Sequence, residues 1–326
     1  MESDEKTLTL ALAAHPGWMS EDFLKAVTGV DAGRLGFLLE DLAKQGKILR
    51  GEDERPYWRM SDPSVAENEM RGLDAGARRE WHRRLFDFIR GQEDTDPLAG
   101  LLAYHAERAD LREEAFSWNL RTGQILSAVR NFAEAQSHYR KAFDFAVSPE
   151  QSAQALLQIG NLECHLGLFR AAEAPYREAL AKLEPLEETS SWIRAAQSLA
   201  AALVERGRYA EAHDLLVRSR SRLEVKGMEL EHGVISLHLT QVYIGMGMMR
   251  EADASLREVK GLFADGAYSA LAPYEQLLEG KLETIQGRLA PAFRIFEEAA
   301  RGVETQGDLA GKREVLLSIS APLMEH

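Results

Sequence analysis

The chain has one cysteine and nine histidines, the side chains most often used for nucleophilic catalysis or metal binding. Cys164 is followed by His165, but neighbouring residues of a helix point about 100° apart, so this histidine is not placed to activate the thiol. His232 and His238 are six residues apart and have no third ligand nearby. No nucleophile-elbow, dinucleotide-binding or kinase motif occurs. We therefore expect no catalytic residue, no metal site, no cofactor and no enzymatic activity, and we interpret Cys164 as a core residue.

The composition is that of a folded, acidic protein. Of the 326 residues 45% are apolar, and the formal net charge is −13. This charge argues against a general binder of polyanions. A single cysteine forms no disulfide framework, so we expect a reducing compartment. The opening residues MESDEKTLTLALAAHPGW do not resemble a secretory leader, and no run approaches the ~20 apolar residues of a membrane span. We expect a soluble, cytoplasmic protein.

A repeat with a period of 40 residues runs through the second half of the chain. Three positions of every copy hold small residues. In order along each copy, they are Gly160, Gly167 and Ala172; Ala200, Gly207 and Ala212; Thr240, Gly247 and Ala252; and Gly280, Gly287 and Ala292. A weaker copy lies upstream, with Gly123 and Ala135. Repetition at a fixed period predicts a stack of helix pairs.

The small residues have a simple structural explanation. Gly160 and Ala172 would lie where the two helices of a pair cross, and Gly167 would end the first helix in the left-handed conformation. In the second helix, Ala172, Tyr176 and Ala179 recur at the spacing of one apolar face. These small and apolar residues indicate packing sites. A catalytic loop would have polar side chains at these positions.

This pattern resembles the tetratricopeptide repeat (TPR), in a variant with a period longer than usual. The resemblance implies a mainly α fold, in which helix pairs form a right-handed superhelical solenoid. We expect about five repeats over residues 96–326, with a terminal capping helix in the tail GKREVLLSISAPLMEH.

The first part of the chain differs from the repeats. Ser20 is a good N-cap for a helix, the next helix is expected to end at Gly46, and KILRGEDERPYWRM is typical of a two-stranded hairpin. We predict a winged helix with a small β-wing over residues 1–63 and a linking helix within residues 64–95. The apolar side of the linking helix is predicted to consist of Trp81, Leu85, Phe86 and Ile89.

Two phrases extend the resemblance to a larger family. RREWHRRL (Arg78 to Leu85) and LLAYHAERAD (Leu101 to Asp110) are similar to the segments that join a winged helix to TPRs in STAND-type (AAA/NACHT-associated) signalling proteins. This chain lacks the ATPase module of that family, since GDLAGKR has the wrong spacing for a P-loop. The resemblance implies the C-terminal region of such a protein, with an ATPase or kinase domain acting in cis or in trans.

The TPR resemblance also implies a concave groove lined by the first helix of each pair. Amide side chains there can bind the backbone of an extended peptide. The positions that match the family pattern are the amides Gln124, Asn161, Gln197 and Gln241, the cations Lys281 and Arg194, the apolar residues Leu157, Leu237 and Leu277, and Tyr274. An alternative is that the leucines pack on neighbouring helices and that the amides are simply solvated.

DNA binding is a weaker possibility for the winged helix. Arg34 and Lys44 are offset by nearby acids on the candidate recognition helix, and the basic cluster Arg78, Arg79, Arg83 and Arg84 is expected to be solvated or paired with acids. The sequence therefore favours a non-enzymatic interaction and sensing module that holds a protein or peptide in its groove. A transcriptional regulator with a TPR sensor and a structural assembly scaffold are the alternatives. The sequence does not identify the ligand, the pathway or the oligomeric state.

Overall fold

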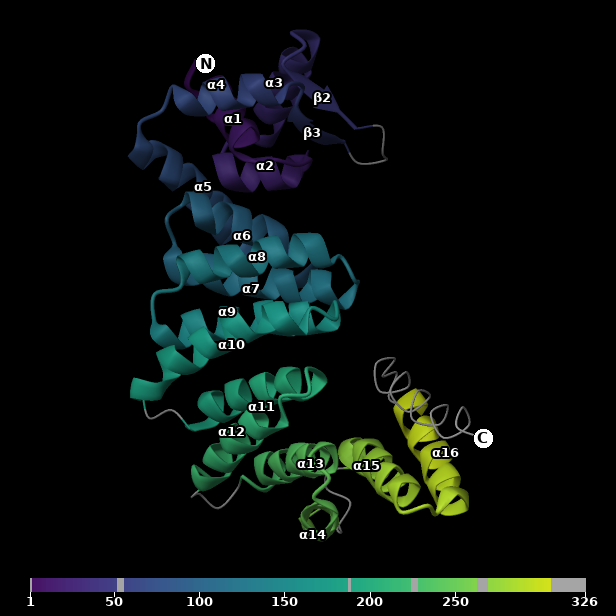
Figure 1. Ribbon diagram of the computed structural model, residues 1–326. Helices are drawn as coiled ribbons and strands as arrows, with labels where there is room; N and C mark the ends of the chain where they lie inside the picture. Colours follow the sequence, from purple (N-terminus) through teal and green to yellow (C-terminus); the bar gives the residue numbers. More distant parts are fainter. Residues whose placement is uncertain (1, 52–55, 187–188, 224–227, 263–268, 306–326) are drawn as a thin grey trace. The chain divides into compact units, whose positions relative to one another are not determined.

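The computed structural model describes residues 2–51, 56–186, 189–223, 228–262 and 269–305. The chain divides into two compact units, Met1–Ala155 and Leu156–His326. Both units are mainly helical, so the predicted α-solenoid class is confirmed (Figure 1). This division falls within the repeats and leaves the predicted boundaries after residues 63 and 95 as predictions.

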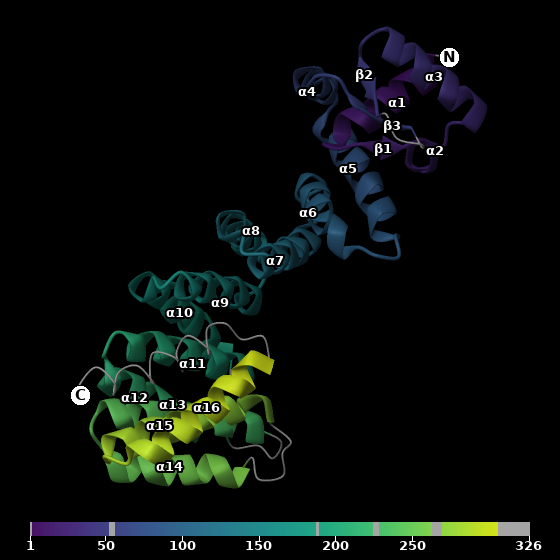
Figure 2. The same ribbon diagram turned by 90° about the vertical axis from the view of Figure 1, so that its right-hand side faces the viewer.

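The first unit begins with four helices and three short strands. They are α1 (Glu2–Ala14), β1 (Met19–Ser20), α2 (Glu21–Thr28), α3 (Ala32–Lys44), β2 (Ile48–Arg50), β3 (Tyr57–Met60) and α4 (Pro63–Arg71). The antiparallel sheet has the order β1-β3-β2, with Met19 opposite Trp58 and Ile48 opposite Met60 (Figure 2). Ser20 caps α2 as predicted, because its hydroxyl accepts a hydrogen bond from the Phe23 N–H at 3.2 Å. The sequence did not indicate α1 or β1.

Helix α5 follows and carries the predicted linking segment. The remaining helices of this unit are α5 (Ala75–Arg90), a short 3-10 turn (Asp96–Leu98), α6 (Ala99–Arg108), α7 (Arg112–Ala128) and α8 (Phe132–Phe145). The predicted apolar side of α5 is confirmed, since Trp81, Leu85, Phe86 and Ile89 are all buried. Neighbouring helices of this series contact one another, α6 with α7 and α7 with α8 (Figure 1).

The described part of the second unit consists of helix pairs. The first helix, α9, begins in the first unit and ends in the second. The elements are α9 (Pro149–His165), α10 (Phe169–Leu183), a 3-10 turn (Glu184–Leu186), α11 (Thr189–Glu205), α12 (Tyr209–Ser221), α13 (Glu229–Gly245), α14 (Met249–Leu262), a 3-10 turn (Ser269–Leu271), α15 (Ala272–Ile285) and α16 (Leu289–Thr305). The second helix of each pair contacts the first helix of the next, as α10 does α11 and α12 does α13. The predicted capping helix at the C-terminal end lies outside the described residues.

In the repeats whose small residue is a glycine, that glycine faces an aromatic ring of the second helix. A Cβ atom on Gly160 would lie 2.5 Å from Cε1 of Tyr176, and one on Gly280 would lie 2.5 Å from Cε1 of Phe296. We had expected Ala172 at this contact; it is buried, but the ring of Tyr176 is what excludes bulk at Gly160. The ring lies where the two helices of the pair cross, and it fits there because glycine has no side chain.

Glycines of the repeat end each first helix in the predicted way. Gly167, Gly207, Gly247 and Gly287 all have φ between 70° and 78°. At Gly167 the N–H bonds to the Cys164 carbonyl, and the next N–H, of Leu168, bonds to the Glu163 carbonyl at 2.8 Å. This pair of bonds is the Schellman cap, which satisfies the last carbonyls of the helix.

Candidate peptide- and protein-binding face

First helices of successive pairs lie next to one another in the second unit. Helix α11 contacts α13, and α13 contacts α15. Asn161, Gln241 and Lys281 directly follow the small residue of their repeats, on α9, α13 and α15. The equivalent residue on α11 is Ala201, and Gln197 lies three residues before the small residue Ala200. We call the four polar residues of these helices, Asn161, Gln197, Gln241 and Lys281, the polar row.

The polar row is neither fully buried nor fully exposed. Each of its members is partly covered, and the Nε2 atom of Gln197 is buried without a hydrogen bond in the described part of the chain. An unsatisfied amide of this kind can bind a peptide group, which both donates and accepts hydrogen bonds. Arg194 is exposed, Tyr274 is half-buried, and Gln124 is half-buried on α7 of the first unit, apart from the row.

The predicted apolar groove residues lie in the core of the free protein. Leu157, Leu237 and Leu277 are 8%, 7% and 3% exposed. Leu237 packs with Ala252 and other core residues, and Leu277 packs with Phe296. Leu277 thus packs on α16, the second helix of its own pair, and the cluster of Leu237 includes residues of α14 and α15. Ligand contact by these leucines stays a prediction.

Asn161 has a partner within its own repeat. The hydroxyl of Tyr176 donates to Oδ1 of Asn161 at 2.8 Å and lies 3.5 Å from the Cys164 sulfur. Burial raises the pKa of Tyr176 and also raises the pKa of the Cys164 thiol. A raised thiol pKa leaves less of the nucleophilic thiolate at neutral pH. This environment agrees with the interpretation of Cys164 as a packing residue.

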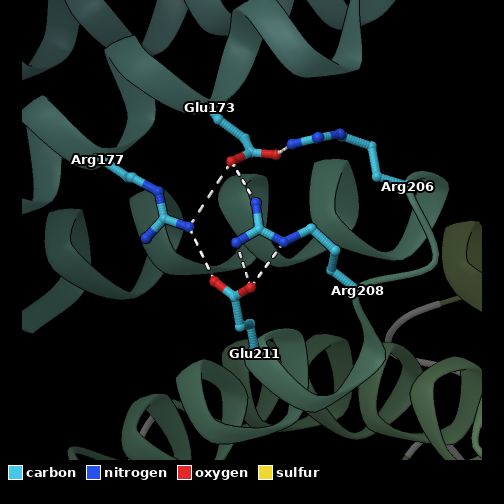
Figure 3. Close-up of polar contacts among 5 residues, drawn as sticks. All are labelled: Glu173, Arg177, Arg206, Arg208 and Glu211. Carbon is cyan, nitrogen blue, oxygen red and sulfur yellow. Dashed lines mark hydrogen bonds and ion pairs between the residues drawn. The ribbon is translucent and has the colours of Figure 1, made fainter.

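An ion-pair network links two successive repeats in the second unit (Figure 3). Its centre is Glu173 of α10, whose carboxylate contacts Arg206 and lies 2.8 Å from Nη1 of Arg208 and 3.7 Å from Nη2 of Arg177. Arg177 and Arg208 both also contact Glu211 of α12. We call these five residues the Glu173 network.

The Glu173 network joins α10 to the turn between α11 and α12. Glu173 is only 9% exposed, and a buried carboxylate is stable there because three guanidinium groups surround it. Hydrogen bonds from Arg208 and then Arg177 lower the pKa of Glu211. Sequence reasoning missed this network, although two arginines flanking the turn glycine Gly207 were a visible signal.

Basic side chains near the candidate recognition helix α3 are engaged within the first unit. Arg34 pairs with Asp4 at 2.7 Å, and Arg50 pairs with Glu40 at 2.9 Å. Lys47 lies 3.6 Å from Glu5. These acids offset the positive charge that phosphate contacts would require.

The described residues show no metal-ligand cluster and no helix able to span a membrane. Among them, no group of three or more His, Cys, Asp or Glu side chains is arranged to hold a metal ion. No helix in the described ranges combines the length and apolar character needed to cross a bilayer.

Solved structures with the same fold include proteins built on helical repeats. A Signal Transduction ATPase with Numerous Domains (STAND) protein with a tetratricopeptide repeat sensor, from Pyrococcus horikoshii, has a TM-score of 0.57 at 15% identity. The match covers 99% of this chain and 47% of that protein, so the chain spans about half the length of its relative.

Two Rap proteins have the same kind of similarity. One, complexed with Competence and Sporulation Factor, has a TM-score of 0.52 at 12% identity, covering 79% of this chain and 85% of that one. The other, the conjugation gene regulator of plasmid pLS20 in complex with the Phr* peptide, has a TM-score of 0.52 at 14% identity, covering 76% and 75%. No protein-family model and no curated protein matches the sequence. At these identities the comparisons establish the fold: the chain contains TPR-like helical repeats.

Proposed function

We propose that the chain is a non-enzymatic interaction module whose polar row binds an extended protein or peptide segment. The observation that carries this proposal is the adjacency of α11, α13 and α15, which places the partly covered side chains of Gln197, Gln241 and Lys281 on neighbouring helices. Peptide-bound Rap proteins of similar fold support it. Arg194 and Lys281 would favour a segment with acidic side chains.

We further propose that residues 1–63 form a winged helix that passes ligand occupancy to an ATPase or kinase domain, in cis or in trans. Support comes from the STAND protein, whose match covers 99% of this chain and which is about twice as long. The paired arginines near α3 favour this role over DNA binding. The polar row would then be the sensing surface of a signalling protein.

The test begins with partners recovered on the immobilised full chain from its native host. Binding of the recovered segment is then measured by calorimetry for the parent and for Gln197→Ala and Gln241→Ala. Removing an amide that serves a buried backbone group typically costs ~1–3 kcal/mol, so we expect affinity to fall about tenfold or more.

Gln286→Ala is the matched control, because this amide is exposed at the end of α15 and is not a member of the polar row. We expect it to bind as the parent does. If all three variants bind equally well, the polar row is not the binding surface. If the immobilised chain instead recovers only further copies of itself, the assembly-scaffold alternative replaces our proposal.

A further inference from the structure

A pocket of about 910 Å³ lies in the first unit, away from the polar row. Its lining comes from the end of α1, strand β3 and helices α4, α5 and α6. This volume lies within the range that binds small molecules, which is roughly 300–1,000 Å³. Neither the repeat pattern nor the similar structures assign a role to it.

Positive charge dominates the lining of this pocket. Four of the lining residues are arginines and one, Glu67, is an acid, so the lining carries a net charge of +3 when its histidines are neutral. Glu67 is itself 3.3 Å from Arg71, which does not line the pocket. In a chain whose formal net charge is −13, such a concentration of cations is a marked local exception. We call the four residues the arginine rim; they are Arg59, Arg78, Arg79 and Arg108.

Two arginines of the rim stack on aromatic rings, and their charges stay available to a ligand. Arg108 lies 3.6 Å from the centre of the Tyr104 ring, and Arg59 lies 4.5 Å from the centre of the Trp18 ring. Stacking of this kind fixes a guanidinium group and leaves its N–H edges free to donate. In the described part of the chain, an acid pairs with only one of the four, Arg79, whose Nη2 is 3.4 Å from Asp110.

Three buried histidines form the floor of the pocket and the layer beneath it. Nδ1 of His15 lies 3.0 Å from Nε2 of His105, and Nδ1 of His105 lies 3.1 Å from Nδ1 of His82. His105 is fully buried, while His15 and His82 line the pocket. Burial lowers the pKa of His15 and of His82 to about 4 and that of His105 to about 2, so all three rings are neutral at pH 7.

The three neutral imidazole rings are joined by two hydrogen bonds, and this leaves one free N–H donor on one of the two outer rings. If His105 donates from Nε2 to His15, then His15 keeps its own proton on Nε2, and His82 must donate from Nδ1. If His105 donates from Nδ1 to His82, the roles of the two outer rings are exchanged. In either arrangement, one of the two rings lining the pocket carries an Nε2–H group. The floor can therefore add one neutral hydrogen-bond donor to the charged donors of the rim.

We propose that this pocket binds a small phosphorylated molecule that carries two or more negative charges. Guanidinium groups match the geometry of phosphate oxygens and bind them in bidentate fashion. A net lining charge of +3 is best neutralised by a multiply charged anion. An acidic protein segment offers the same sign of charge, but a pocket volume of about 910 Å³ is in the range of sites for compact ligands.

Calorimetry of the full chain with inorganic pyrophosphate tests the proposal. The titration is done at ~0.15 M salt, where screening suppresses general attraction between exposed charges. We expect saturable binding, and we expect Arg78→Gln and Arg108→Gln each to weaken it about tenfold, because each removes a charge-assisted contact. Both side chains are exposed, so the fold is expected to tolerate both changes.

Arg83→Gln is the matched control. This arginine is exposed on the same helix as Arg78, carries the same charge and does not line the pocket. We expect its affinity to equal that of the parent. Equal weakening by all three variants would show general attraction to positive charge and would overturn the proposal, as would a lack of pyrophosphate binding. Binding of tetraglutamate without binding of pyrophosphate would instead identify an acidic protein segment as the ligand. Because none of these changes touches the polar row, the outcome is independent of the proposed peptide-binding function.

Discussion

The contact between Gly160 and Tyr176 makes residue 160 intolerant of even one additional carbon. An alanine there would place its methyl group 2.5 Å from the ring, so the ring or the helix must move. Overpacking of this kind typically costs about 1–3 kcal/mol, and we expect Gly160→Ala to lower the melting temperature. Thermal unfolding followed by circular dichroism measures the change.

A second substitution checks the cause of that loss. Two other repeats combine Ala200 with Leu216 and Thr240 with Leu256 at the same spacing of 16 residues. Adding Tyr176→Leu to Gly160→Ala reproduces the Ala200 combination, and we expect it to recover part of the lost stability. Gly36→Ala is the control, since a Cβ there has no neighbour within 4 Å. A parent-like melting curve for Gly160→Ala alone would show that the ring is not a fixed obstacle.

The three buried histidines make the first unit sensitive to acid. Their folded pKa values lie below the ordinary 6.5, so the unfolded chain binds more protons and stability rises with pH. Their contribution is complete above about pH 6.5 and is lost as the pH falls towards 4. For His15 alone, the loss at pH 5 is of the order of 2 kcal/mol. Denaturant unfolding at pH 7.5 and pH 5.0 measures it.

The variant His105→Gln separates this effect from general acid denaturation. A glutamine keeps one donor and one acceptor between the two outer rings but cannot take up a proton. We expect this variant to lose less stability than the parent between the two pH values. His165→Gln removes an exposed histidine and is expected to behave as the parent does. Equal acid sensitivity of His105→Gln and the parent would refute the explanation.

At the scale of elements, the repeats could be predicted because each one carries the same local signals. The glycine that ends each first helix and the small residue seven positions earlier both act within one helix pair, so their spacing is visible in the sequence. Helix α1 could not be predicted in this way. Leu8, Leu10 and Leu12 alternate as in a strand, yet all three are buried in a helix. Packing on all sides of α1 overrides its local pattern.

The upstream copy of the repeat departs from this pattern at one residue. Arg130 takes the place of the turn glycine and has φ of 62°, a conformation that costs a non-glycine residue roughly 1–2 kcal/mol. The gain from Arg130→Gly is reduced by the greater freedom of glycine in the unfolded chain, so we expect stabilisation of up to about 1 kcal/mol.

Arg130→Ala is the control for that change. It removes the same side chain but does not relieve the backbone, so we expect no gain in stability. Equilibrium unfolding in urea compares the two variants with the parent. Equal stabilities of the glycine and alanine variants would mean that the left-handed conformation at residue 130 carries no measurable strain.

At the scale of the whole molecule, we expect the Glu173 network to couple the unfolding of the two repeats that it joins. A repeat array is cooperative only while the interfaces between neighbours are strong. Glu173→Gln removes the charge that faces three arginines, and the partial exposure of these arginines limits the cost to about 2 kcal/mol. We expect broader or biphasic unfolding of the repeats, measured by urea titration.

Arg257→Gln provides the comparison, because its ion pair with Asp253 is confined to one helix and its side chain is 72% exposed. Exposed pairs of this type contribute little, so we expect an unchanged transition. A single sharp transition for Glu173→Gln, at the midpoint of the parent, would show that apolar packing alone couples these repeats.

The candidate binding residues were only partly accessible to sequence reasoning. Gln241 and Lys281 hold equivalent positions on successive first helices, because a periodic structure repeats its geometry, whereas Gln197 holds the position of Leu237. The binding role of these residues stays a prediction. Burial of Leu237 depends on the neighbouring helix and could not be derived from one repeat. The contact between Glu173 and Arg208 joins residues 35 positions apart. Asp253 and Arg288 repeat this charge pair two periods later and also interact, but the repeat between them has His213 and Met248 at these positions, so the periodic signal is interrupted.

The pairing of a small residue with a ring also governs which deletions of one repeat period this chain can tolerate. Loss of residues 208–247 removes one period and retains a glycine at the turn. It leaves Ala200 opposite Leu256, which is the same alanine–leucine pair that Ala200 already forms with Leu216. Loss of residues 168–207 would instead place Gly160 opposite Leu216 and open a void, and loss of residues 248–287 would force the ring of Phe296 against Thr240. Deletions of one period are therefore not interchangeable: the boundary at which a copy is removed decides whether a ring meets a glycine or a larger side chain, and with it the stability of the product.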